Sequence, residues 1–176
     1  MTRGREGDPI PSGLWLIRLV REDWFEAEQG RLVWVDPHAF DLSSDDKKAT
    51  PPHLSLFVEA MTTLDQAWEL GGRNIRKTHA ILVPVGAVRS VSSNAGSLDV
   101  VWTRTGGAAG PGSCGHVGIV GWQLGDDAAS KKRRKHVRQR LADAAREYGK
   151  LQSILAACGP MVQSAVPANS EPDNGP

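Results

Sequence analysis

Residues 130–158 constrain the fold of this chain more than any other stretch, because apolar side chains recur there at steps of three and four. That spacing places them on one stripe of an α-helix, which has to be buried against the rest of the protein. Asp126, Asp127 or Ser130 is able to cap the first turn, and Gly159-Pro160 ends the helix, because Pro cannot continue it and Gly accepts a left-handed cap. Gly149 weakens the predicted helix by about 1 kcal/mol relative to Ala. The apolar stripe consists of Val137, Leu141, Ala144, Ala145, Tyr148, Leu151, Leu155 and Cys158.

The first half of this predicted helix carries seven positive charges within ten residues, with no acidic residue among them. The whole chain has a formal net charge of +1, so everything outside this window carries −6. Clustered cations repel one another and oppose the positive end of the helix dipole, and a bound polyanion would relieve both costs. The predicted polyanion-binding residues are Lys131, Lys132, Arg133, Arg134, Lys135, Arg138 and Arg140.

Nucleic acid and the acidic face of another protein are the partners that this charge distribution predicts. A membrane surface is not predicted, because no bulky apolar residue interleaves with the basic half of the helix. A solvated helix face, or one that complements the acidic remainder of the chain, stays open as the alternative. Association into homo- or hetero-oligomers also stays open.

A chain of 176 residues, 40% apolar and 23% charged, fits a soluble globular protein with one sizeable core. No apolar run approaches the ~20 residues needed to span a bilayer. Arg18 breaks the first apolar segment, which argues against a signal peptide. Inside a buried strand this arginine needs a paired acid or a ligand anion, unless it points outward at the strand end.

The two cysteines, Cys114 and Cys158, lie far apart without CxxC spacing. We expect reduced thiols in a cytoplasmic protein, although a disulfide stays open. The abundance of Gly, Ala, Val and Arg favours a GC-rich bacterial source.

Six segments have the apolar patterns of β-strands, and Thr63 with Gln66 matches a capping box at the start of a short helix over residues 62–70. The order of these elements predicts an α+β fold. Its sheet is mixed, mostly antiparallel and of about six strands, with one short helix and one long basic C-terminal helix. The predicted strands are residues 14–20, 31–35, 53–58, 79–85, 98–103 and 116–123.

The chain is predicted to form a single domain over residues 13–159, which ends in the basic helix over residues 130–158. Two prolines argue against regular structure in residues 1–12, which are predicted to be a flexible leader. Residues 160–176 are rich in Pro, Ser and Asn and are predicted to be a disordered tail.

The Gly-rich segment over residues 105–115 does not match a phosphate-binding loop, because it has no lysine and leads into a strand. Cys114 and His116 share one face of an extended segment, where a thiolate beside an imidazolium would be nucleophilic. The string GHVGIVGW is similar to the histidine-bearing strand of CHAP-type cysteine peptidases. In those peptidases the nucleophilic cysteine lies upstream, and no cysteine precedes Cys114. Peptidase chemistry is therefore not predicted.

The order of elements resembles that of RES-type and ADP-ribosyltransferase-like domains. An arginine in the first strand, an LSLF strand, a Thr-capped DQAWEL helix and an HAILVPV strand carry this resemblance. It implies NAD binding by an arginine and a glutamate near the ribose, with Arg18, Ser55 and Glu69 as the positions to test. The chain lacks the GRWN-like segment of the RES family.

No catalytic, metal or nucleotide motif is otherwise present, and the five histidines are scattered without metal-ligand spacing. We therefore predict a small bacterial interaction or accessory protein without catalysis, metal or cofactor, whose basic helix contacts nucleic acid or an acidic protein. An NAD-binding enzyme of ADP-ribosyltransferase-like type is the first alternative. A structural subunit of a larger complex is the second.

Overall fold

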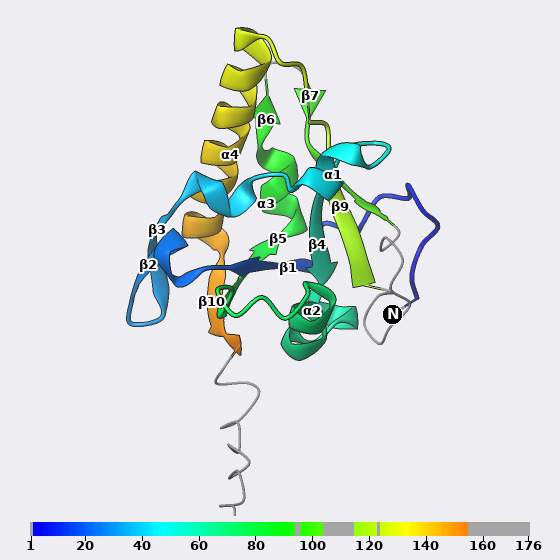
Figure 1. The fold of residues 1–176 in the computed structure, drawn as a ribbon. Coiled ribbons are helices and arrows are strands. Elements are labelled where there is room, and N and C mark those ends of the chain that lie inside the picture. The colour runs from blue at the N-terminus through cyan, green and yellow to red at the C-terminus, as the bar shows by residue number, and fades with distance from the viewer. Residues whose placement is uncertain (1, 94–95, 104–114, 123, 155–176) are drawn as a thin grey trace, which may run out of the picture.

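A computed structural model describes residues 2–93, 96–103, 115–122 and 124–154 of the chain (Figure 1). Within these residues the chain forms a six-stranded antiparallel sheet and four α-helices, which confirms the predicted α+β class. The predicted tail over residues 160–176, Cys114 and Cys158 lie outside the described residues.

The main sheet has the strand order β10-β5-β1-β4-β9-β8, and every neighbouring pair is antiparallel. Five of its strands follow the predicted strand segments. The sixth, β10, lies where a helix was predicted. The strands are β1 Trp15–Val20, β4 Leu54–Val58, β5 His79–Pro84, β8 Asp99–Trp102, β9 His116–Val120 and β10 Lys150–Ser153.

The remaining elements connect or cover this sheet. The helices are α1 Ser44–Lys48, α2 Leu64–Leu70, α3 Val85–Ser90 and α4 Ala128–Tyr148. Two small hairpins pair β2 Phe25–Glu28 with β3 Arg31–Val35, and β6 Ser92–Ser93 with β7 Gly96–Ser97. Single 3-10 turns are η1 Glu22–Trp24, η2 Pro37–Phe40 and η3 Glu59–Met61.

The two faces of the sheet pack into separate apolar clusters, because successive side chains of a strand point to opposite sides. Leu16, Leu56 and Ile81 belong to the larger cluster, which α3 and α4 cover. Ile17 and Phe57 belong to the smaller cluster, which α2 covers. The sheet is therefore buried on both faces.

Part of the predicted apolar stripe holds α4 against the larger cluster through buried Val137, Leu141 and Ala145, whereas Tyr148, predicted to lie on the same stripe, is exposed. Asp127 is the N-cap, and its carboxylate accepts hydrogen bonds from the backbone N–H and the hydroxyl of Ser130, at 2.9 and 2.5 Å. The capping box of Thr63 and Gln66 at the start of α2 is also present.

The predicted helix over residues 130–158 is too long at its C-terminal end, because α4 ends at Tyr148. Gly149 takes an extended conformation, and β10 then pairs with β5 through Leu151 opposite Ile81. An alanine Cβ at Gly149 would lie 2.2 Å from the carbonyl oxygen of Ala145. The edge of β5 offers hydrogen bonds to β10, and this long-range pairing outweighs the local helical spacing.

Three further segments differ from the prediction. Residues 31–35 form a separate hairpin with β2 and do not join the main sheet. Residues 41–52, which lie between two predicted strands and carry no predicted helix, contain α1. Part of the predicted leader lies along β8, since the N–H of Ile10 donates to the carbonyl of Val100 at 2.9 Å and Ile10 is buried.

We predict that Gly149→Ala destabilises the protein by about 1–3 kcal/mol, because the new Cβ overlaps the last turn of α4. If Gly149 lay inside a helix, the same change would instead stabilise by about 1 kcal/mol. Urea unfolding distinguishes the two signs. Gly13→Ala is the control, since an added Cβ there meets nothing within 4 Å.

Candidate functional site

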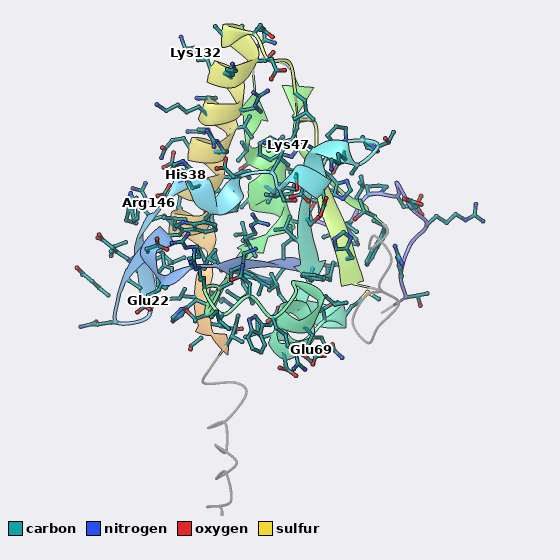
Figure 2. All side chains as sticks on the ribbon, viewed as in Figure 1. Glu22, His38, Lys47, Glu69, Lys132 and Arg146 are labelled. Carbon is teal, nitrogen blue, oxygen red and sulfur yellow. The ribbon has the colours of Figure 1, made fainter. Side chains whose placement is uncertain are left out.

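One flank of the basic half of α4 faces a hollow of about 300 Å³, which we call the basic pocket. Lys131, Arg134 and Arg138 line it, because residues spaced by three and four share one side of a helix. Lys47 on α1 adds a fourth cation to the lining. Figure 2 places Lys47 on α1. The other lining residues are Asp41, Leu42 and Trp122.

Asp41 supplies the one carboxylate among the residues that line the basic pocket. It forms an ion pair with Arg138 that joins α4 to the segment after η2. The Nε atom of Arg138 is buried and has no hydrogen-bond partner among the described residues. Arg134 donates to the carbonyl of Gly125 at 2.8 Å. The pocket therefore keeps an excess of positive charge at a wall that holds an unsatisfied donor.

The remaining predicted cations of α4 do not line the basic pocket. Lys132, Lys135 and Arg140 are exposed and make no ion pair with any described residue, and Arg133 is exposed as well. Figure 2 shows Lys132 at the far end of α4 from Glu69 on α2. The basic stretch is thus displayed to solvent at one end of the molecule.

A second polar site lies where β1 and β4 separate. β1 pairs with β5 along its whole length, but with β4 only at Leu16 and Ile17. Beyond that point the guanidinium of Arg18 enters the gap and donates to three carbonyls. These are Ala39 at 2.7 Å, Ser55 at 3.1 Å and Asp41 at 3.2 Å.

The buried carboxylate of Asp46 accompanies Arg18. It accepts hydrogen bonds from the hydroxyl and the N–H of Ser55, at 2.5 and 3.2 Å, and from the N–H of Ser43 at 2.8 Å. Burial favours the neutral acid, but the hydrogen bonds and the charge of Arg18 outweigh it and hold the pKa of Asp46 below its ordinary value. Asp46 is therefore an ionised structural partner of Arg18.

The gap between the strands opens into a cleft of about 440 Å³, which we call the β1–β4 cleft. Its polar walls include Lys77, which is half-buried and lies between α2 and β5, and His116 at the start of β9. The cleft is lined by Ile17, Arg18, Leu19, Ser43, Asp45, Asp46, Ser55, Phe57, Leu70, Gly71, Lys77 and His116.

His116 is held as a neutral imidazole. Burial, together with repulsion from His53, lowers the pKa of His116 to about 4. Its Nδ1 atom lies 2.8 Å from the hydroxyl of Thr103, and its ring packs edge-on against Phe57 with the centroids 5.5 Å apart. The ring is therefore fixed in orientation and uncharged near neutral pH.

The structure brings together two of the three residues that the ADP-ribosyltransferase resemblance singled out. Arg18 donates to the carbonyl of Ser55, and both line the β1–β4 cleft. Glu69 is not among the residues that line the cleft, and its carboxylate pairs with Arg73 one helical turn further along the chain. The guanidinium of Arg18 is engaged by backbone carbonyls.

Sequence reasoning missed Lys47, Trp122, Asp46 and Lys77. Asp46 had a readable local pattern, because Ser43 three residues earlier makes a capping box with it. The other three lie in loops, or on a short helix, without a motif. They reach their pockets only through long-range packing.

No protein-family description, curated protein or solved structure matches this chain. None of the described helices is both long and apolar enough to cross a membrane. The described residues also contain no group of three or more His, Cys, Asp or Glu side chains placed to hold a metal ion.

We predict that Asp46→Asn destabilises the protein by about 2–3 kcal/mol, because it removes a buried charge that accepts three hydrogen bonds beside Arg18. Asp45→Asn, a change at the adjacent exposed residue, should alter the free energy of unfolding by less than about 0.5 kcal/mol. Equal effects in urea unfolding would contradict the role of this network.

We also predict that His116 makes the folded protein less stable as the pH is lowered. Since the unfolded histidine takes up a proton near its ordinary pKa of 6.5 and the folded one only at about 4, stability drops as the pH falls between these values. The full loss is about 3 kcal/mol and stops growing below pH 4.

Urea unfolding between pH 7 and pH 4 measures this loss. The loss should shrink in His116→Gln and persist in His136→Gln, because His136 is exposed. A titration of His116 near pH 6.5 by NMR would refute the prediction. Asp46 contributes little to the change between pH 7 and pH 4, since most of its stabilisation is lost as the pH falls through 3.8 and below.

Proposed function

We propose that this protein binds nucleic acid through the phosphate backbone, with the basic pocket as the contact surface. The observation that carries the proposal is the convergence of four cations, from α1 and α4, on a hollow whose lining has one carboxylate. A phosphate in that hollow would offset the excess of positive charge there and would offer an acceptor to the buried Nε of Arg138.

The surroundings of the basic pocket favour phosphates over an acidic protein. Protein–protein interfaces usually have an apolar, often aromatic, centre. The exposed large apolar residues among the described ones are Val33, Trp34, Ile75 and Tyr148, and none lies in the basic half of α4. Trp122, which lines the pocket, offers a half-buried aromatic face beside the cations, as in sites where bases stack.

The surface supports contact with the backbone and not the reading of base sequence. About four phosphate contacts predict a plot of log affinity against log salt with a slope of roughly −3 to −4. Affinity should differ little between sequences of equal length, because phosphate contacts carry no sequence information.

The proposed role is that of a non-catalytic bacterial protein that acts in the cytoplasm. The NAD-binding alternative is not carried forward, since Glu69 does not join Arg18 and Ser55 in the β1–β4 cleft. The structural-subunit alternative lacks an observation that favours it over nucleic-acid binding.

Fluorescence anisotropy with labelled 20-nucleotide single strands and duplexes tests the proposal. The double variant Lys47→Gln/Lys131→Gln removes two cations that line the basic pocket. We expect weaker binding and a salt slope shallower by about 2, since each lost phosphate contact reduces the slope by about 1.

The matched control is Lys48→Gln/Lys132→Gln, in which the next residue along each helix is changed. These lysines are also exposed but do not line the basic pocket. The control should keep most of the affinity and slope. Equal losses in the two variants would indicate a diffuse field in place of a pocket, and wild-type binding in both would refute the proposal.

A further inference from the structure

We propose that the β1–β4 cleft is a binding site for a small molecule that has an anionic head group, a carboxylate or a phosphate, and an apolar body. This site is separate from the basic pocket and does not depend on nucleic-acid binding. The proposed site depends on Lys77, a residue to which neither the predicted role of α4 nor the NAD resemblance gives a function.

Lys77 is the charged group in the cleft that is neither fully solvated nor satisfied by the protein. It is half-buried, and its ammonium makes no hydrogen bond or ion pair with any described residue. Burial lowers the pKa of Lys77, and the nearby charge of Arg18 lowers it further, against the opposing effect of Asp46. A ligand anion beside the ammonium would offset both the burial and the repulsion.

The other charges of the cleft are already engaged. Arg18 donates three N–H groups to backbone carbonyls. Both oxygens of Asp46 accept hydrogen bonds from Ser43 or Ser55. Asp45 also lines the cleft, but it is exposed and solvated at the mouth. Lys77 is therefore the cation left for an incoming anion.

The rest of the lining matches a ligand with an apolar part. Leu19 and Phe57 are buried members of the smaller apolar cluster, and Leu70 packs against that cluster, so one wall of the cleft is hydrocarbon. His116 is neutral, with Nδ1 taken by Thr103, so its other ring nitrogen can form one hydrogen bond. A volume of about 440 Å³ lies within the usual range for small-molecule sites.

The strand separation explains why a cleft exists at this place in the sheet. β4 pairs with β9 from Leu54 to Phe57, but with β1 only at Phe57 and Val58. The backbone between Ser55 and Arg18 is therefore held open by the guanidinium of Arg18 in place of a continuous ladder. A site built on strands and a buried ion network keeps its shape before a ligand arrives.

Isothermal titration calorimetry with three one-ring probes tests the proposal: phenyl phosphate, benzoate and the neutral benzamide. The titrations use the Lys47→Gln/Lys131→Gln protein, in which the basic pocket has lost two of its four cations and competes less for anions. We expect saturable binding of phenyl phosphate, benzoate or both, and none of benzamide. The preferred anion then identifies the head group.

The decisive change in the Lys47→Gln/Lys131→Gln background is Lys77→Gln. It should lower the affinity for the anion at least about tenfold, while Lys77→Arg should retain binding. Arg76→Gln is the matched control, because it removes one exposed charge from the same loop and does not line the cleft. The affinity of the Arg76→Gln protein should stay within about twofold of the background protein, as expected for an exposed charge that is screened by salt.

Amide chemical shifts give a readout that does not need the Lys77 variants to fold. The bound anion should perturb the N–H groups of Ser55, Phe57 and His116. Four results would overturn the proposal. They are chemical-shift changes confined to α4, binding of benzamide as strong as that of the anions, an unchanged anion affinity in Lys77→Gln, and no saturable binding of either anion. None of these results tests the nucleic-acid proposal, which is decided by the salt dependence of nucleic-acid binding.

Discussion

The hydrogen bonds of Arg18 are the interaction on which the arrangement of the two pockets depends. The guanidinium joins three segments that are distant in sequence, because it binds the carbonyls of Ala39, Asp41 and Ser55. It keeps β1 and β4 apart and anchors η2 to the sheet. A buried arginine is stable only when its donors are satisfied and an acid lies near, and Asp46 fills the second requirement. Without these hydrogen bonds nothing would hold β1 and β4 apart beyond Ile17.

Asp41 connects the two pockets. Its carbonyl accepts from Arg18 at the β1–β4 cleft, while its carboxylate pairs with Arg138 in the basic pocket. The same short segment after η2 thus forms a wall of both sites. The basic half of α4 is costly in itself, because cations crowd the positive end of the helix dipole. The cap provided by Asp127 and the apolar stripe of the second half keep the helix formed.

Parts of these sites were readable from the sequence, and the limits have physical causes. The seven cations of α4 are visible in the chain, but which of them line a hollow depends on the segments that fold beside the helix. Lys47 and Lys48 are neighbours of equal chemistry, and only Lys47 lines the basic pocket. Arg18 and Ser55 stood out as candidates, yet their partner is Asp46 and not Glu69. Lys77 has no motif at all, so only its burial marks it.

The sequence by itself determined the α+β class, the antiparallel preference, the caps of α2 and α4 and the location of the positive charge, because each follows from local spacing or composition. The tertiary structure alone decided where α4 ends and that β10 completes the sheet, that residues 31–35 form a separate hairpin, and that Arg18 opens a cleft. These outcomes depend on hydrogen bonds between residues far apart in the chain. Pairing a free strand edge or a buried donor changes the free energy of folding by as much as several local helix or strand propensities do. Such partners are identified only when the chain is folded.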